Sequence, residues 1–378
     1  MPIYKTSGKK NSLQRYNVRI NYVADNGKPT QLTRVAYGID NAKILEMKIL
    51  EQIKVNEEQP VKKMTVQQLF DEYIIIKKYE IKETSLLKIE QLFGYYILPI
   101  FKNCRIDKIT PQALQEWKIF LAKKNLSLHT KKSAYGYFRA FINYAIKMEY
   151  IHKNPLTKIG NFKEAYYIKP EMNFYTPDEF KVFISKAKEI AKEKEQTQND
   201  LSEWNYYVFF NIAFYTGLRK GEIHALKWTD INGEYLSVKR SLTQRLNGGL
   251  GIETTPKTAS SIRTLQMPLP LIKILEKQKA RQQLLHNFTD DFRITNNIRN
   301  GSIDRRNKNY STWAGIKTIR IHDFRHSHAS LLANCNINIQ EVSRRLGHAR
   351  IEMTWNTYCH LYPKEEEKAV SILNSFVY

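Results

Sequence analysis

The chain has 378 residues, and its 60 lysines and arginines against 37 aspartates and glutamates give a formal net charge of +23. Hydrophobic residues make up 42%, enough for packed cores, which argues against a fully disordered chain, and the length indicates two or three domains. No run approaches the roughly 18 apolar residues of a membrane span, and the first residues lack the apolar region of a signal peptide. Three widely separated cysteines form neither a zinc pattern nor a disulfide framework, so we expect a protein of the reducing cytoplasm.

The positive charge is spread along the chain and is not concentrated in one tail. A basic excess of this kind attracts a polyanion, and DNA or RNA is the usual partner. The alternative is a lysine-rich protein with ordinary solvated surfaces, and charge alone leaves both open.

The N-terminal residues alternate apolar and polar side chains over 14–23, which is the period of a half-buried strand. A turn signal at 25–28 and a return strand over 30–37 follow, and then a helical pattern to about residue 58. We expect a small sheet backed by one helix. Its polar face would carry three candidate DNA-binding residues, Arg15, Arg19 and Arg34. The alternative is a structural extension without a ligand.

A polar segment with a proline, 56–63, reads as a linker, and an all-helical region follows it. Thr65 and Gln68 form a capping box, and Thr110-Pro111 is a second helix start. The predicted helices are 65–78, 84–96, 110–125 and 130–148. The last helix carries Lys131, Lys132 and Arg139, which could contact a phosphate backbone or form an ordinary solvated face.

A second linker is predicted over 153–175, after which a capping box at Thr176 opens another helix. Residues 204–215 are apolar nearly all round, as in a buried central helix. Strand patterns follow at 235–240 and 261–268. Further helices are predicted at 269–286, 322–334, 338–346 and 363–374.

Four short motifs stand out in the C-terminal part: TGLRKGE (216–222), HDFRHSHAS (322–330), LGH (346–348) and TWNTYCH (354–360). Each alone has a plain structural explanation, such as an arginine at a helix junction, a capping histidine or a packing tyrosine. Taken together they supply two arginines and two histidines that could bind phosphate oxygens, and a tyrosine that could act as a nucleophile. The residues are Arg219, His322, Arg325, His348 and Tyr358.

The order and spacing of these five residues resemble the tyrosine recombinase family, the phage-type integrases. The resemblance implies a multidomain α+β fold in three parts. Residues 1–58 would form an arm-type DNA-binding domain with a small three-stranded sheet and a helix, and 62–158 an all-helical core-binding domain. Residues 172–378 would form a mainly helical catalytic domain with a small β-sheet.

The resemblance also implies a catalytic lysine near a strand turn. Lys257, in PKTASSIRTL (256–265), is the first choice, and Lys239 is the second; the alternative for Lys257 is a solvated hairpin lysine. Glu222 would be a buried carboxylate that orients Arg219. Asp323 is interpreted as a helix-terminus carboxylate without a catalytic role.

The residues themselves suggest the chemistry. Arginines and histidines around a phosphodiester offset the charge of its transition state, and a tyrosine hydroxyl can attack phosphorus to give a phosphotyrosine. A lysine can protonate the leaving 5′ oxygen. The sequence has no paired-carboxylate metal site and no Gly-rich phosphate loop, so we expect no cofactor, neither Mg²⁺ nor ATP.

The resemblance implies a site-specific recombinase of a phage or other mobile element, acting through a 3′-phosphotyrosyl intermediate and a Holliday junction in a bacterial cytoplasm. Its partners would be double-stranded DNA at core and arm attachment sites, three further copies in a homotetramer, an excision or directionality factor and a host DNA-bending protein, with no membrane. Residues 363–376 would pack on a neighbouring protomer, or in cis. The alternatives are a type IB-like topoisomerase and a non-catalytic DNA-binding protein.

Overall fold

The computed structural model describes residues 3–10, 12–23, 29–57, 63–163, 172–244, 251–254, 261–362, 370–371 and 373–375. The chain divides into two compact units, Met1–Tyr167 and Ile168–Tyr378. The first unit holds two separate hydrophobic clusters, one on each side of the predicted linker at 56–63. None of the described helices is long and apolar enough to cross a membrane.

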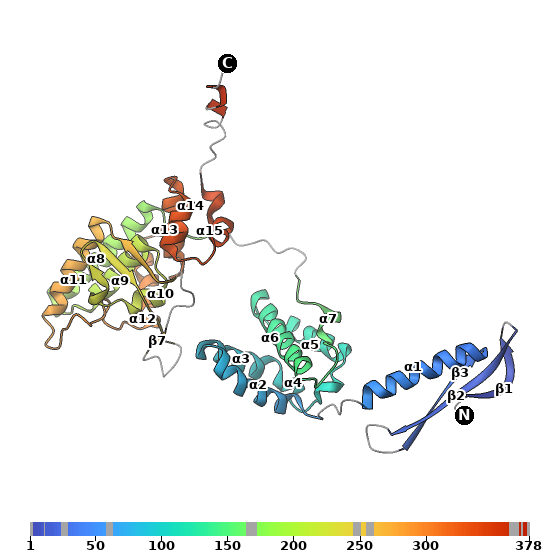
Figure 1. Ribbon diagram of the computed structural model, residues 1–378. Coiled ribbons are helices and arrows are strands. Elements are labelled where there is room, and N and C mark those ends of the chain that lie inside the picture. The colour runs from blue at the N-terminus through green and yellow to red at the C-terminus, as the bar shows by residue number, and fades with distance from the viewer. Residues whose placement is uncertain are drawn as a thin grey trace. The chain divides into compact units, whose positions relative to one another are not determined.

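The first cluster belongs to an antiparallel sheet with the order β1-β2-β3 and to the helix that follows it (Figure 1). These elements are β1 (Ile3–Lys10), β2 (Leu13–Val23), β3 (Pro29–Tyr37) and α1 (Ile39–Glu57). Val18 and Ile20 from β2 and Ala36 from β3 are buried against Ala42 and Ile49 of α1. The expected small sheet backed by one helix is therefore confirmed.

The register of β2 and β3 corrects one prediction about the arginines. Val18 pairs with Arg34, whereas Arg19 pairs with Thr33 and Arg15 with Tyr37. Directly paired residues share one face of a sheet. Arg34 therefore lies on the face that α1 covers, and Arg15 and Arg19 lie on the opposite face. The prediction that all three arginines share one polar face was wrong. It rested on their polarity alone, whereas the strand pairing puts Arg34 on the same face as the buried Val18.

The helical part of the first unit contains the four predicted helices and three short ones that were not predicted. Its elements are α2 (Val66–Glu80), α3 (Glu83–Tyr96), α4 (Leu98–Phe101), η1 (Ile106–Lys108), α5 (Pro111–Lys123), α6 (Leu128–Lys147) and α7 (Leu156–Ile159). The capping box at Thr65 is present: its hydroxyl accepts from the amide of Gln68 at 3.2 Å, and Gln68 Oε1 accepts from the amide of Thr65 at 2.9 Å. The short helix α7 lies in the segment that was interpreted as a linker.

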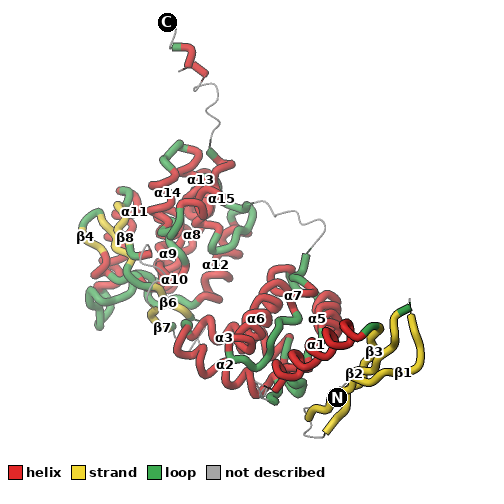
Figure 2. The backbone as a smooth tube through the Cα atoms, turned by 45° about the vertical axis from the view of Figure 1, so that its right-hand side comes forward, coloured by secondary structure: helices red, strands yellow, loops and turns green. Residues whose placement is uncertain are grey.

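The second unit is mainly helical with two small sheets, ordered β4-β5-β8 and β6-β7 (Figure 2). Its helices are α8 (Pro177–Gln198), α9 (Ser202–Thr216), α10 (Lys220–Ala225), η2 (Trp228–Asp230), α11 (Leu269–Gln283), α12 (Asn300–Trp313), α13 (Asp323–Asn334), α14 (Ile339–Leu346), α15 (Ile351–Tyr358) and η5 (Cys359–Leu361). Its strands are β4 (Ile231–Asn232), β5 (Tyr235–Val238), β6 (Ser241–Thr243), β7 (Ile252–Thr254) and β8 (Arg263–Gln266).

Helix α9 is the buried central helix that its all-round apolar sequence predicted, and it packs against α8, α11 and α13. Two α-helices of this unit, α12 and α15, were not predicted, nor were the short helices η2 and η5. The sequence of α12 is polar over most of its length, so its periodicity is weak. The helix predicted at 363–374 lies mostly outside the described residues. The multidomain α+β fold with its small sheets is confirmed.

Candidate active site

The turn between α9 and α10 positions the first arginine. Helix α9 ends at Gly217, which has φ +64°, and a Cβ there would lie 2.7 Å from the ring of His328. Arg219 follows as the residue that caps α10, and its Nη1 donates to Glu222 Oε1 at 2.9 Å. Glu222 is buried, so it is a fixed carboxylate that holds one edge of the Arg219 guanidinium.

The second arginine, Arg325, lies on the first turns of α13 and is 3% exposed. Its Nη1 donates to the carbonyl of Gly217 at 2.9 Å, and its Nη2 donates to the carbonyl of Leu346 at 2.7 Å. Within the described part of the chain, no carboxylate lies within ion-pair distance of this guanidinium. Arg325 therefore joins three segments through backbone carbonyls alone, and its positive charge has no paired anion.

The LGH motif spans the end of α14 and the loop after it, and the tyrosine motif spans the C-terminal part of α15 and the start of η5. Gly347 ends α14 with φ +66°, and His348 follows it with Nδ1 at 2.8 Å from Thr354 Oγ1. Tyr358 is the last residue of α15 and is 1% exposed. Its hydroxyl lies 2.7 Å from Nδ1 of His326 on α13.

These side chains line one cavity of about 270 Å³. The lining residues are Arg219, His322, Arg325, His326, His348, Met353, Thr357 and Tyr358. Five of the six predicted catalytic residues are thus brought together from α10, α13, α15 and the loop after α14. The sixth, Lys257, lies outside the described residues. The second choice, Lys239, is exposed just after β5 and does not line the cavity.

The electrostatics of the cavity favour an anionic ligand. Desolvation and the nearby Arg325 lower the pKa of His322, and they lower the pKa of His348 to about 4. Desolvation raises the pKa of Tyr358 to about 12, although Arg325 acts in the opposite direction. Desolvation and Arg219 lower the pKa of Arg325 to about 9, which still leaves it charged at neutral pH. The resting cavity therefore combines charged guanidinium groups with neutral imidazoles and a protonated tyrosine.

Besides the lining residues Met353 and Thr357, two residues of the site were not predicted from the sequence. His326 comes one helical turn after His322, so an i, i+4 relationship in HDFRH was an available signal. Arg263, on β8, is buried, and it donates from Nη2 to Glu222 Oε2 at 3.0 Å and from Nε to the carbonyl of Arg345 at 2.7 Å. No local pattern marks Arg263, because its partners are far away in the sequence.

The predicted DNA-contact residues of the first unit do not form one cluster. Arg19 and Arg34 are exposed on opposite faces of the sheet, and Arg15 is half-buried. Lys132 and Arg139 are exposed and seven residues apart on α6, so they share a helix face. Lys131 points its Nζ to the carbonyl of Ala122 at 3.3 Å. Their contact with DNA stays a prediction.

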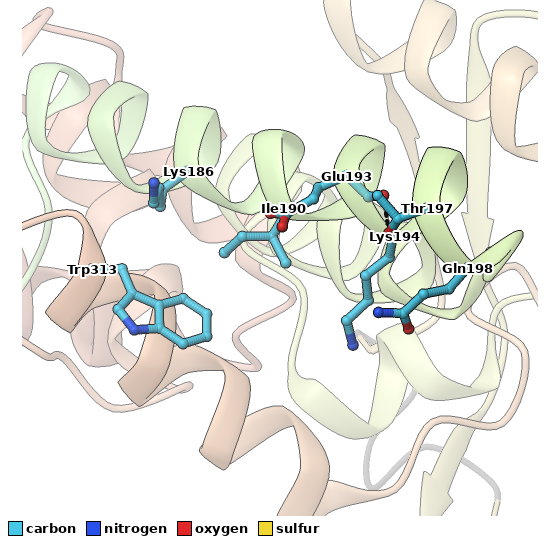
Figure 3. A pocket seen from close by; sticks show the side chains of 7 residues that line it. All are labelled: Lys186, Ile190, Glu193, Lys194, Thr197, Gln198 and Trp313. Carbon is cyan, nitrogen blue, oxygen red and sulfur yellow. Dashed lines mark hydrogen bonds between the residues drawn. The ribbon is translucent and has the colours of Figure 1, made fainter.

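Another cavity of the second unit, about 490 Å³, lies along α8 and contains none of the predicted catalytic residues (Figure 3). Trp313, at the end of α12, faces Ile190 across it (Figure 3). Lys194, which lines it, is held by Glu203 at 2.8 Å. The lining of this cavity has no cluster of arginine, histidine and tyrosine side chains. The cavity of about 270 Å³ is therefore the better candidate for the active site.

Comparison with known proteins gives the family. Residues 173–365 match the phage integrase family, and residues 65–121 match the phage integrase N-terminal SAM-like domain. The ICEBs1 integrase of Bacillus subtilis is 26% identical over 98% of this chain and 100% of its own length. A XerC-like tyrosine recombinase of Caldanaerobacter subterraneus is 31% identical over 79% of this chain and 76% of its own length.

Solved structures agree in fold. The Tn1549 transposon integrase in complex with a circular intermediate DNA has a TM-score of 0.65 at 23% identity and covers 83% of this chain and 100% of the solved chain. A lambda integrase tetramer bound to a Holliday junction has a TM-score of 0.54 at 16% identity and covers 92% of this chain and 96% of the solved chain. Together with the matched motifs, these findings show that the chain belongs to the phage integrase family of tyrosine recombinases, enzymes that cut and rejoin DNA.

Proposed function

We propose that this chain recombines DNA at specific sites and so integrates and excises a mobile element. The observation that carries the proposal is the buried charge of Arg325, which no described carboxylate pairs, beside Arg219 at a cavity that also contains Tyr358. A buried cation without a counter-ion costs several kcal/mol, on the order of the penalty for desolvating one ion. A phosphodiester bound in the cavity would supply that counter-ion.

Each side chain then has a part in the reaction. Arg219 and Arg325 bind the non-bridging oxygens, and His322 and His348 donate to the same phosphate as negative charge grows on it. The hydroxyl of Tyr358 attacks phosphorus and becomes joined to the 3′ phosphate while the 5′ oxygen leaves. Lys257 protonates that oxygen. The bond energy stays in the phosphotyrosine, so the 5′ hydroxyl of a second strand can reverse the step.

The division of labour follows the three predicted parts of the chain. Residues 62–158 and 172–378 would clamp the core site, and residues 1–58 would hold arm sites through Arg15, Arg19 and Arg34. We further propose a homotetramer that exchanges strands through a Holliday junction, assisted by a directionality factor and a host DNA-bending protein, in a bacterial cytoplasm. Two separate hydrophobic clusters in the first unit support the boundary near residues 58–62.

The test is covalent trapping. The full chain is incubated without added metal with fragments of the genome that carries its coding sequence, and DNA joined to protein in SDS is recovered and sequenced. We expect adducts at one defined sequence, none with Tyr358→Phe, and normal amounts with Tyr362→Phe. Tyr362 is a matched control because its hydroxyl bonds the carbonyl of Ile337, at 2.9 Å, and does not line the cavity.

Three other results would contradict parts of the proposal. Bound DNA without any adduct would indicate a non-catalytic binder. Adducts spread over all sequences would indicate a topoisomerase. An adduct that persists in Tyr358→Phe would mean that another tyrosine is the nucleophile.

Removing residues 1–58 should preserve cleavage of the core site but impair recombination, and unchanged recombination would contradict the arm-binding role.

A further inference from the structure

The hydroxyl of Tyr358 has a hydrogen-bond partner that the proposed reaction does not use. Within the described residues, that partner is His326, whose Nδ1 lies 2.7 Å away, with the two ring centroids 5.6 Å apart. His326 follows Arg325 directly on α13, and its ring packs edge-on against that of His322 at 5.2 Å. The nucleophile is thus held by a side chain that lines the same cavity.

The acid–base properties of the pair fix where the proton rests. Desolvation raises the pKa of Tyr358 to about 12, and desolvation together with His322 lowers the pKa of His326 to about 4. At neutral pH the tyrosine is therefore protonated and the imidazole is neutral. An O–H that faces a neutral ring nitrogen at this distance can donate to it, and His326 then carries its own hydrogen on Nε2.

We propose that His326 accepts the proton of Tyr358 as Tyr358 attacks the phosphodiester, an inference that rests on the function proposed above. In this step the bond between the tyrosine oxygen and phosphorus forms and the bond between phosphorus and the 5′ oxygen breaks. The tyrosine proton moves to Nδ1 of His326, and the leaving 5′ oxygen takes a proton from the acid of the site. Rejoining reverses both transfers, so no proton is gained or lost over the cycle.

The charges around His326 make this transfer depend on bound DNA. From α13 and the residues before it, His326 faces His322, Asp323, Arg320 and Arg325, and from α15 it faces Tyr358. The arginines disfavour an imidazolium in the resting protein. A phosphodiester held by Arg219 and Arg325 offsets their charge, which raises the pKa of His326. His326 thus becomes an effective proton acceptor only when a phosphate is bound, and Tyr358 stays protonated in the absence of DNA.

The first experiment needs no DNA. The full chain is labelled with ¹⁵N-histidine, and the His326 signals are assigned by comparison with His326→Asn. We expect an unprotonated Nδ1 and a protonated Nε2 at pH 7. A protonated Nδ1 would mean that the ring donates to the tyrosine oxygen, and that result would overturn the proposal whether or not the chain cleaves DNA.

The second experiment measures single-turnover cleavage of the site recovered by trapping, as a function of pH. His326→Asn keeps a polar group of similar reach but cannot accept a proton at neutral pH. We expect its rate to be about 100-fold below that of the wild type near pH 7. The deficit should shrink as the pH rises toward about 10, because Tyr358 then ionises more readily without help. A deficit of the same size at every pH would show a merely structural role.

A modified substrate separates the base from the acid. A 5′-bridging phosphorothioate leaves as a thiolate, which needs no proton. It should restore cleavage by a Lys257→Met variant and leave the His326→Asn deficit unchanged; restoration of His326→Asn would overturn the proposal. His360→Asn is the matched control, since His360 is exposed two residues after Tyr358. If the wild type forms no adduct, the proposed function is wrong. The tautomer measurement would still decide whether the hydroxyl of Tyr358 donates to Nδ1 of His326.

Discussion

The buried guanidinium of Arg263 donates to the carboxylate of Glu222, with 3.0 Å between Nη2 and Oε2. The other oxygen of Glu222 accepts from Arg219 at 2.9 Å. One carboxylate therefore ties strand β8 to the start of α10 and fixes an arginine of the cavity. Arg263 and Arg219 together keep the pKa of Glu222 below its ordinary value, even though burial acts in the opposite direction.

Replacing this carboxylate should lower the stability of the folded chain. Glu222→Gln leaves the buried charge of Arg263 without a counter-ion, so we expect the free energy of unfolding to fall by about 3 kcal/mol, as measured by urea denaturation. The control is Glu341→Gln, because Glu341 forms an exposed pair with Arg344. Breaking a surface pair of this kind should change stability by less than about 1 kcal/mol. Equal losses in the two variants would contradict a special role for the Glu222 pairs.

The glycine that ends α14 offers a test of packing against Arg263. A Cβ at Gly347 would lie 2.8 Å from Arg263 Nη1, whereas a Cβ at Gly315 meets nothing within 4 Å. Both glycines have nearly the same positive φ, +66° and +67°. Alanine therefore costs about 1 kcal/mol at either position through backbone strain. We expect Gly347→Ala to lose more stability than Gly315→Ala, because the added Cβ also displaces Arg263. Gly347→Ala should form covalent DNA adducts more slowly than the wild type, and Gly315→Ala should form them at the wild-type rate.

The shape of Arg325 should matter as much as its charge. A lysine keeps the positive charge but lacks the planar fork whose two terminal nitrogens bond the carbonyls of Gly217 and Leu346. We expect Arg325→Lys to cleave DNA at least about 100-fold more slowly while still binding it. Single-turnover cleavage and a binding titration at fixed salt measure the two effects. Arg305→Lys, at an exposed position of α12, is the control, and an equal loss of rate there would contradict the assignment.

A buried histidine should make the stability of the second unit sensitive to acid. His328 Nδ1 donates to the carbonyl of Phe214 at 2.8 Å, and desolvation with the nearby Arg345 lowers the pKa of His328 to about 3. An unfolded histidine titrates near pH 6.5, so between about pH 6.5 and pH 3 the unfolded chain binds one more proton than the folded chain. Stability therefore falls with decreasing pH by up to about 1.4 kcal/mol per pH unit from this group.

His328→Asn removes that titration and keeps an N–H donor for the carbonyl of Phe214. We expect urea denaturation between pH 6 and 4 to show a slope reduced by about one proton in this variant. His360→Asn should leave the slope unchanged, because His360 is exposed. A slope that is identical in the wild type and in His328→Asn would show that His328 does not stay neutral in the folded protein.

The sequence by itself determined much of the fold and of the cavity. Capping residues such as Thr65 and Thr176 and the apolar run of α9 are local signals, so they predicted helices where the structure has them. The five residues chosen from the four motifs all line the cavity, since their types and order are themselves the signal. Polar α12 was missed because a helix stabilised by neighbours need not show a strong periodicity.

Only the tertiary structure decided which partners these residues have. The register of β2 against β3 placed Arg34 and Arg19 on different faces of the sheet, although polarity had suggested a common face. His326 meets Tyr358, and Arg263 meets Glu222, across 32 and 41 residues of chain. Local patterns report which side of an element is buried, but such contacts depend on how separate elements pack. The partners of Tyr358 and of Glu222 therefore appear only once α13 packs against α15 and β8 packs near α10.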